Sequence, residues 1–290
     1  MKYYYRNLLI KYNNTINTIV LIINNKQLEK YVEAIKGDTI LGIDTEFRRI
    51  DSYFPELCLI QIASKYQLEC IDVLSISNLQ PLFDKLYDGK TLWVIHSARQ
   101  DIEALYYLSD RIPSLLFDTQ IGASFLNYPL QVSYQSLTEK LQNILLDKQY
   151  TRFDWRIRPL PNDVLQYALD DVKYLLPNYN NLTKELKNKG KLDWAEEEVE
   201  LLLNKDTFKP NFRMILKKTK GISKISHQNQ ENAFRLILWR ESTAQQKNKP
   251  RRWIMSDEAL IAYADGTRKL SNDQNILFEK FIRNTKLKVR

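Results

Sequence analysis

Four acidic residues in three separate segments are the side chains of this sequence best suited to chemistry. They are Asp44 and Glu46 in the run LGIDTEF, Asp101 in HSARQD and Asp171 in QYALDD. Asp44 and Glu46 end a strand-like apolar run, and the period-two alternation of a strand puts them on the same face. Two neighbouring carboxylates repel each other and resist burial unless a cation lies between them. Mg²⁺ and Mn²⁺ prefer oxygen ligands, so the pattern predicts a metal site suited to phosphate chemistry.

The segments that carry Asp101 and Asp171 are predicted to be helices. Asp101 lies in the first turn of a helix over 99–108, at the border of its apolar stripe, although the helix dipole alone also favours an acid there. In a helix predicted over 162–187, the turn of 100° per residue places Asp171 beside the buried face. Tyr167 lies one turn before Asp171 on the same side. It can orient or deprotonate a water molecule there, or it is an ordinary amphipathic residue at the edge of the core.

The elements expected around these residues form an α/β arrangement. Strands are expected over 18–23, 39–46, 57–63, 67–73 and 91–95. Helices are expected over 25–36, 79–87, 99–108, 119–126, 133–142, 162–187 and 193–204. Strands that first pair through short turns and then alternate with helices favour a mixed sheet flanked by helices. The segment 146–161 has no clear period and is expected to be a loop.

A second, all-helical domain is expected toward the C-terminus. Its helices are predicted near 228–247, from Ser256 onward and after Ser271. The expected organisation is an N-terminal extension over 1–17, an α/β domain over 18–204, a linker over 205–211 and a small helical domain over 212–290.

Composition excludes several classes of protein. Of the 290 residues, 44% are hydrophobic and 27% are charged, which is typical of a globular protein. No apolar run approaches the roughly 20 residues needed to cross a bilayer. The run from Ile19 to Ile23 is also too short for a secretory signal. The two cysteines, Cys58 and Cys70, and two histidines are too few for a structural zinc site. We therefore expect a cytoplasmic protein that does not contact membranes.

Charge is unevenly distributed along the chain. The segment 209–290 carries 19 basic and 7 acidic residues, whereas the first 208 residues carry 24 basic and 28 acidic ones. An acidic body can hold metal while a basic tail holds phosphates, which is what a nucleic-acid enzyme requires. The alternative is that the excess charge only keeps the tail soluble.

The acidic residues fall in motifs that resemble those of the ribonuclease D family, in the tyrosine-bearing branch of the DEDD 3′–5′ exonuclease superfamily. IDTEFRR followed by YFPELCLIQIA resembles the first exonuclease motif, and IHSARQDIEAL followed by FDTQIGASFL resembles the second. QYALDDVKYLLP matches the third motif, and FDWRIRPLP resembles the segment that precedes it. The resemblance covers about residues 18–200, with the motifs in the same order.

This resemblance implies a fold, a pair of cofactors and an activity. The implied fold is a ribonuclease-H-like mixed sheet flanked by helices. Asp44, Glu46, Asp101 and Asp171 would hold two divalent ions, Mg²⁺ or Mn²⁺, while Tyr167 assists the attacking water. The implied reaction hydrolyses RNA from its free 3′ end to nucleoside 5′-monophosphates, in tRNA 3′ maturation or RNA turnover. No Walker-type glycine loop is present, so no nucleotide cofactor is expected.

The tail, about 210–290, is similar to the helicase-and-ribonuclease-D C-terminal helical module through AFRLILWRESTAQQKNKPRRWIMSDEALIAYA. Bacterial ribonuclease D commonly carries two such modules, and only one fits here. Within it, Lys249, Arg251, Arg252 and Trp253 combine cations with an aromatic ring, which suits a single RNA strand. A solvated surface is the alternative for any one of them.

Further candidate RNA contacts lie nearer the carboxylates. Lys148 and Arg158 precede the third motif and could guide the strand inward. His96 precedes the helix of Asp101, and it either lines the cleft or is a strand-end histidine with its own partners. Asp118 is expected to cap the helix that begins at Thr119.

Two other functions compete with an exoribonuclease. One is a 3′–5′ exonuclease acting on DNA, as in proofreading-type relatives, and the other is a catalytically inactive nucleic-acid-binding protein. By resemblance, FDWRIRPLP and the single helical module favour RNA. The complete set of carboxylates together with Tyr167 argues against an inactive protein.

Overall fold

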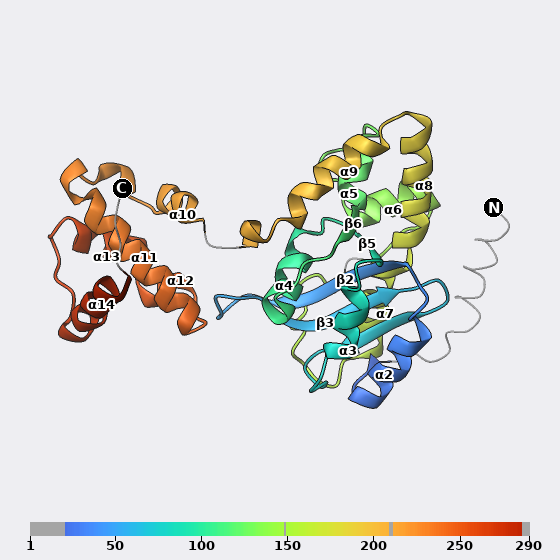
Figure 1. Cartoon of the computed structure of the whole chain (residues 1–290), viewed down its shortest axis with the longest axis horizontal. Coiled ribbons are helices and arrows are strands. Elements are labelled where there is room, and N and C mark those ends of the chain that lie inside the picture. The colour runs from blue at the N-terminus through green and yellow to red at the C-terminus, as the bar shows by residue number, and fades with distance from the viewer. Residues whose placement is uncertain (1–20, 148, 209–210, 286–290) are drawn as a thin grey trace. The chain divides into compact units, whose positions relative to one another are not determined.

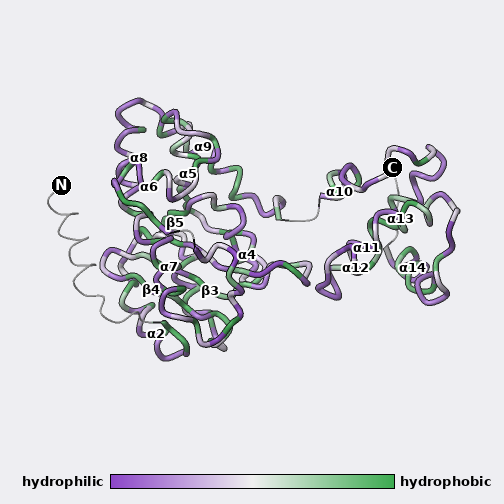
Figure 2. The backbone as a smooth tube through the Cα atoms, turned by 180° about the vertical axis from the view of Figure 1, so that it is seen from behind, coloured by the Kyte–Doolittle hydropathy of each residue, from purple (hydrophilic) through white to green (hydrophobic). Residues whose placement is uncertain are grey.

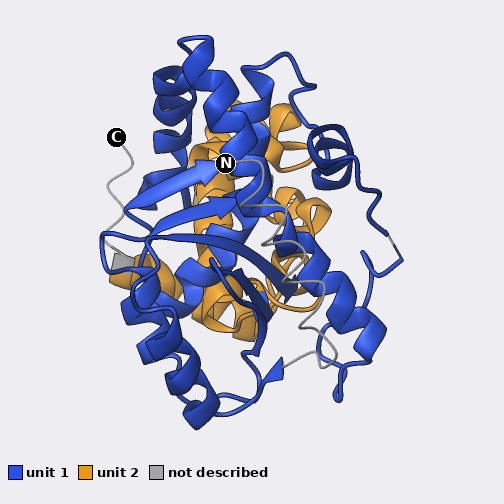
Figure 3. Cartoon of the chain, turned by 90° about the vertical axis from the view of Figure 1, so that its right-hand side faces the viewer, with its two compact units in different colours: residues 1–48, 56–208 blue, residues 49–55, 209–290 orange. Residues whose placement is uncertain are grey.

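The computed structural model describes residues 21–147, 149–208 and 211–285 (Figure 1). The chain forms two compact units: unit 1 comprises Met1–Arg48 and Glu56–Phe208, and unit 2 comprises Arg49–Pro55 and Lys209–Arg290 (Figure 3). The segment Arg49–Pro55 therefore belongs with the C-terminal unit, although it joins two consecutive strands of unit 1. No local sequence pattern predicts that this segment joins unit 2. The predicted extension over 1–17 lies outside the described residues.

Unit 1 is built on a mixed sheet of six strands in the order β1-β4-β3-β2-β5-β6. The strands are β1 (Leu21–Ile22), β2 (Ile40–Arg48), β3 (Glu56–Ala63), β4 (Leu68–Asp72), β5 (Leu92–Ile95) and β6 (Leu115–Asp118). β5 is parallel to both β2 and β6, and β1 is parallel to β4, whereas β3 is antiparallel to both of its neighbours. The predicted mixed sheet is confirmed, and β6 is a strand that the sequence did not indicate.

Helices pack on both faces of this sheet (Figure 1). They are α2 (Asn25–Ala34), α3 (Gln80–Leu86), α4 (Arg99–Ser109), α5 (Thr119–Ser124), α6 (Tyr134–Gln142), α7 (Asn162–Lys173), α8 (Leu175–Asn188) and α9 (Leu192–Glu200), followed by 3₁₀ turns at Leu201–Leu203 and Lys205–Phe208. Ile43, Ile60 and Trp93 form one core with α2, α3 and α4. Leu59 packs with α7, and Val94 packs with α7 and α8, on the opposite face. In Figure 2, hydrophobic colour concentrates along the inner strands, whereas the outer helix α8 is largely hydrophilic.

The turn from β5 into α4 is fixed by Asp118, the last residue of β6. Its carboxylate accepts hydrogen bonds from the backbone N–H groups of Ser97 at 3.0 Å and Ala98 at 2.8 Å. The same carboxylate accepts from the N–H of Gln120 at 2.8 Å. Asp118 therefore caps α5, as predicted, and also holds the start of the helix that carries Asp101.

The single helix predicted over 162–187 is wrong, because the helix is interrupted at Tyr174. α7 ends at Lys173 and α8 begins at Leu175. The Tyr134 hydroxyl donates to the Asp170 carbonyl at 3.2 Å and accepts from the Tyr174 N–H at 3.0 Å. These are the two backbone groups that a continuous helix would join. Pro177, in the first turn of α8, also interrupts the helix, because it has no N–H to donate to the Lys173 carbonyl and its ring clashes with that group.

Unit 2 is helical, as the sequence predicts for this part of the chain. Its helices are α10 (Phe212–Lys218), α11 (Gln230–Gln246), α12 (Arg251–Ile254), α13 (Asp257–Ala264) and α14 (Asn272–Thr285), with 3₁₀ turns at Ile222–Lys224 and His227–Asn229. Ser256 caps α13 by accepting from the N–H of Ala259 at 3.1 Å. Leu236, Ile237 and Leu260 are among the residues of its core. In the described parts of both units, no helix has the length and apolar character that crossing a membrane requires.

Candidate active site

Strand β2 and helix α7 bring three of the predicted metal-binding carboxylates together. Asp44 and Glu46 alternate along β2, and Asp171 lies in the last turn of α7. One carboxylate oxygen from each of these residues lies within 4.8 Å of the other two. All three side chains are partly buried. The strand and helix periods thus place these acids where they can share an ion.

The fourth predicted ligand, Asp101, lies beside this group rather than within it. Its side chain is buried in the first turn of α4. One of its oxygens, Oδ1, accepts hydrogen bonds from the Thr45 hydroxyl at 2.6 Å and the Thr45 N–H at 3.2 Å. Because Thr45 lies between Asp44 and Glu46 in β2, these bonds tie α4 to the strand that carries both acids. The sequence reasoning missed Thr45, since only the tertiary structure brings it to Asp101.

Burial raises the pKa of every carboxyl group in this set. Removal from water is the largest cause of the rise in the pKa of Asp44 and Glu46, and the neighbouring carboxylates add to it. Burial also raises the pKa of Asp101 to about 7 and the pKa of Asp171 to about 7. A cation would stabilise the ionised forms that otherwise repel one another. Because the donors are carboxylate oxygens, the set fits a hard divalent ion.

Tyr167 lies one helical turn before Asp171. Burial raises the pKa of Asp171, and a hydrogen bond from the Tyr167 hydroxyl partly offsets that rise. Burial, followed by the charge of Asp171, raises the pKa of Tyr167 far above its usual value, so the phenol stays protonated at neutral pH. The Tyr167 ring contacts Trp155 and Tyr150, with centroid distances of 6.4 Å and 5.9 Å. These contacts come from the loop that precedes α7 and fix the direction of the phenol.

The loop over 146–161 is irregular where it is described, as predicted. Arg158 attaches it to β4, because its Nε and Nη2 each lie 2.7 Å from a different carboxylate oxygen of Asp72. The same guanidinium donates to the carbonyls of Trp155 at 2.6 Å and Cys58 at 3.2 Å. Burial alone would raise the pKa of Asp72, but the hydrogen bonds from Arg158 and Ser75 outweigh it and lower that pKa. Arg158 thus braces the loop in this structure, and an RNA contact by Arg158 stays a prediction.

Both ring nitrogens of His96 have partners in the structure. Nδ1 lies 2.9 Å from the Thr119 hydroxyl, and Nε2 lies 2.9 Å from the Val132 carbonyl. Burial lowers the pKa of His96, so the ring is neutral at neutral pH. This arrangement matches the alternative of a strand-end histidine with its own partners, and a contact with RNA stays a prediction. The other candidate near the third motif, Lys148, lies outside the described residues.

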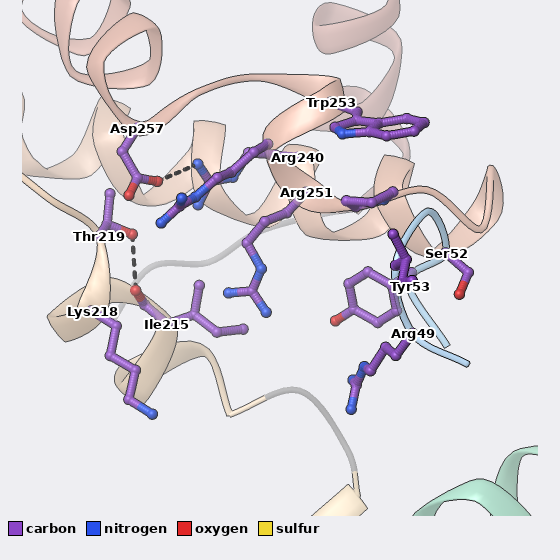
Figure 4. Close-up of a pocket in the computed structure, with 13 residues that line it drawn as sticks. Arg49, Ser52, Tyr53, Ile215, Lys218, Thr219, Arg240, Arg251, Trp253 and Asp257 are labelled. Atoms are coloured by element: carbon purple, nitrogen blue, oxygen red, sulfur yellow. Dashed lines mark hydrogen bonds and ion pairs between the residues drawn. The ribbon is translucent and has the colours of Figure 1, made fainter. Parts of the chain in front are cut away.

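Unit 2 contains a pocket of about 500 Å³ (Figure 4). Three of the RNA contacts predicted in the tail line it, namely Arg251, Arg252 and Trp253. The fourth, Lys249, has its Nζ 5.6 Å from the centroid of the Trp253 ring. Trp253 is 64% exposed, so its ring is open to a ligand.

Residues from two distant segments complete this pocket. Arg49 and Tyr53 come from the segment Arg49–Pro55, and Lys218 comes from the end of α10. The Tyr53 hydroxyl lies 3.2 Å from a carboxylate oxygen of Glu241 in α11, which fixes the segment within the unit. The sequence reasoning missed these residues, because no local pattern connects a turn between two strands with a helix so far along the chain.

The walls of the pocket are predominantly basic. Its basic side chains are Arg49, Lys218, Arg240, Arg251 and Arg252, and Asp257 is the acid in the lining. Arg240 is fully buried and lies 2.7 Å from Asp257. Arg251 Nε lies 3.5 Å from the buried carboxylate of Glu241. The basic side chains still outnumber these two acids, so the pocket favours an anion.

Comparisons with known proteins agree on one kind of enzyme. A family model described as 3′–5′ exonuclease matches residues 19–187. Ribonuclease D of Bartonella henselae is 39% identical over 246 residues, which cover 84% of this chain and 60% of that protein. This chain therefore spans less than two thirds of that relative.

Two solved structures share the architecture. Escherichia coli RNase D, described as an exoribonuclease involved in structured RNA processing, superimposes with a TM-score of 0.83 at 26% identity, over 93% of this chain and 76% of that one. The catalytic core of RRP6 from Trypanosoma brucei gives a TM-score of 0.67 at 22% identity, over 94% and 80% of the two chains. The second likeness concerns the fold alone.

Proposed function

Because this chain belongs to the 3′–5′ exonuclease family, we propose that it is a metal-dependent exoribonuclease that acts from the free 3′ end of RNA. Its products are nucleoside 5′-monophosphates. The observation that carries this proposal is the group of Asp44, Glu46 and Asp171, whose oxygens lie within 4.8 Å of one another. The similarity to ribonuclease D proteins supports RNA as the polymer.

In this proposal, Asp44, Glu46, Asp101 and Asp171 hold two divalent ions, Mg²⁺ or Mn²⁺. When bound, such ions activate water and stabilise the charge on the attacking and leaving oxygens of a phosphodiester. The Oδ1 atom of Asp101 is held by Thr45, which leaves Oδ2 for an ion. The negative charges of the carboxylates also repel phosphates from positions where no metal ion neutralises them. This repulsion restricts where the RNA backbone can lie in the site.

Tyr167 orients the attacking water. Its pKa is raised far above the usual value by burial and by the charge of Asp171, so the hydroxyl is a hydrogen-bond donor and acceptor rather than an anionic base. The phenol therefore fixes the direction of the water toward the phosphorus rather than removing its proton. Alignment of this kind is a major part of the catalysis of in-line displacement.

The natural substrates in this proposal are the 3′ ends of structured RNA, with tRNA precursors or RNA in turnover as the candidates. The description of the Escherichia coli relative, which names structured RNA processing, supports this choice. A single-stranded 3′ end must enter, because the carboxylates have to reach the last phosphodiester.

The basic pocket of unit 2 is proposed to bind a nucleotide of the same RNA strand (Figure 4). Lys218 and Arg252 are exposed cations in its lining, suited to a phosphate, and the exposed ring of Trp253 is suited to stacking on a base. Stacking of a base on an aromatic side chain contributes about 1–3 kcal/mol and tolerates any base. The pocket therefore adds affinity without adding sequence preference.

The activity is tested with 5′-labelled RNA and DNA strands of the same sequence in Mg²⁺ or Mn²⁺. We expect metal-dependent shortening of RNA from the 3′ end, blocked by a 3′-phosphate and abolished in Asp44→Asn and Asp171→Asn. Asp170→Asn is the matched control, because Asp170 is adjacent in α7 but bonds to Gln166 and Lys173 instead. Faster shortening of DNA would favour the DNA exonuclease, and no shortening of either polymer would favour an inactive binding protein.

The pocket is tested by comparing a long RNA with a dinucleotide, both of whose nucleotides flank the single phosphodiester to be cut. We expect Trp253→Ala to raise KM for the long RNA about tenfold, which corresponds to about 1.4 kcal/mol of stacking, and to leave the dinucleotide unchanged. Trp194→Ala is the control, because Trp194 is also exposed, at 58%, and lies in unit 1. An equal effect of Trp253→Ala on both substrates would contradict the assignment.

A further inference from the structure

A buried glutamine opposite Asp44 has no role in the mechanism above. We propose that Gln61 is a positioning residue for Asp44, because its carboxamide can donate a hydrogen bond to the carboxylate oxygen that does not bind metal. This inference rests on the metal site proposed above and adds to it a residue that supports one ligand.

The register of the sheet places Gln61 next to Asp44. On β3, Gln61 pairs with Asp44 of β2 on one side and with Cys70 of β4 on the other. Residues directly opposite each other in an antiparallel pair point to the same face, with Cβ atoms about 4.5–5.5 Å apart. The Gln61 side chain therefore lies on the carboxylate face of the sheet, which α7 covers.

The carboxamide of Gln61 is fully buried and unsatisfied. Its exposed fraction is 0%, and among the described residues neither Oε1 nor Nε2 has a hydrogen-bond partner. A buried polar group without a partner destabilises a fold, so such groups usually have a functional reason. Leu59 and Ala168 on this face are apolar, and the Cys70 thiol is a weak donor. The strong acceptor that the register places opposite Gln61 is the Asp44 carboxylate.

Other acids of the site already have a hydrogen-bond donor of this kind. Asp101 accepts from Thr45 at 2.6 Å, and Asp171 accepts from the Tyr167 hydroxyl. Groups that hold a metal ligand in place fix its orientation, and their loss typically weakens metal binding about 10–100-fold. The register puts Gln61 on the neighbouring strand where its carboxamide can supply the corresponding donor to Asp44.

The substitution Gln61→Met tests this role, because it removes the amide and nearly preserves length and volume. Mn²⁺ binding to the metal-free protein is measured by titration calorimetry, and stability is measured by urea unfolding in EDTA. We expect the dissociation constant for Mn²⁺ to rise about 10–100-fold. The urea midpoint of the metal-free variant should be equal or higher, because two unpaired polar atoms have left the core.

Asn178→Leu is the matched control for a buried amide away from the site. Asn178 is fully buried, but its amide has partners, Gln142 at 3.0 Å and Thr138 at 2.9 Å. We expect this variant to lose stability and to keep its affinity for Mn²⁺. Gln61→Met should therefore weaken Mn²⁺ binding without a loss of stability, whereas Asn178→Leu should lose stability without weaker Mn²⁺ binding.

Two results would overturn the inference. One is an unchanged affinity of Gln61→Met for Mn²⁺, and the other is a lower urea midpoint, which would show that the amide is already satisfied in the metal-free protein. Gln61→Leu repeats both measurements if the methionine variant does not fold. If the unsubstituted protein itself binds no divalent ion, the proposed function fails instead, so the two failures are distinguishable.

Discussion

Replacing Asp101 with asparagine should stabilise the metal-free protein, and more so as the pH rises. The carboxyl group is buried, and burial raises its pKa from 3.8 to about 7. A difference of about 3 pKa units corresponds to about 4 kcal/mol, because each unit is worth about 1.4 kcal/mol. Asparagine removes the charge and keeps an Oδ1 atom that can still accept both hydrogen bonds from Thr45.

The direction of this pH dependence follows from the pKa of Asp101 being higher in the folded state than in the unfolded chain. Between the ordinary value of 3.8 and the folded value of about 7, the unfolded chain is ionised while the fold retains the proton. The wild-type protein therefore loses stability over this window as the pH rises, and Asp101→Asn does not. We expect the advantage of the variant to grow from about 2 kcal/mol at pH 5 to about 4 kcal/mol at pH 8.5.

The assay is urea unfolding in EDTA at pH 5, 7 and 8.5, repeated in excess Mg²⁺. Metal should reverse the order at pH 8.5, because it stabilises the ionised carboxylate of the wild-type protein. Asp72→Asn is the control: the pKa of Asp72 is lowered by Arg158, so this variant should be destabilised by nearly the same amount at pH 5 and 8.5. An advantage of Asp101→Asn that stays constant or shrinks with pH would refute the reasoning.

Three other outcomes are expected. Tyr167→Phe should lower kcat by a factor on the order of 10² with little change in KM, measured in steady-state assays on RNA, because the water loses an orienting hydroxyl. Arg158→Met should destabilise the protein by about 3–5 kcal/mol in urea unfolding, because it leaves the buried carboxylate of Asp72 without its partner at 2.7 Å. The affinity for Mg²⁺, measured by calorimetry, should rise as the pH approaches 7, by about tenfold per pH unit for each proton displaced, since the pKa of Asp171 is raised to about 7.

Local periodicity was sufficient to find the acids of the site. The two-residue period of β2 and the helical period of α7 are short-range properties of the backbone, so they could be read before any packing was known. They placed Asp44, Glu46 and Asp171 on surfaces that meet. The cap at Asp118 was equally local, because its partners at Gln120 and Ile121 follow directly in sequence.

Features that depend on distant partners could not be predicted in this way. β6 has only the four residues LLFD and is a strand because it pairs with β5. The hydroxyl that pairs with the backbone at the helix break comes from Tyr134, 40 residues earlier in the chain. The segment Arg49–Pro55 belongs to unit 2 through contacts such as that of Tyr53 with Glu241. In each case the deciding contact is tertiary, and no window of sequence contains both partners.

The hydroxyl group of Tyr134 affects the orientation of the Asp171 carboxylate. It bonds both to the Asp170 carbonyl and to the Tyr174 N–H, so this side chain holds the backbone of the turn that bears Asp171. The Tyr134 ring also packs edge-to-face against His96, with ring centroids 5.7 Å apart. The residue that follows β5 therefore contacts the side chain that holds this turn. Phenylalanine at this position would remove both hydrogen bonds, while Pro177 in the first turn of α8 would still prevent one continuous helix.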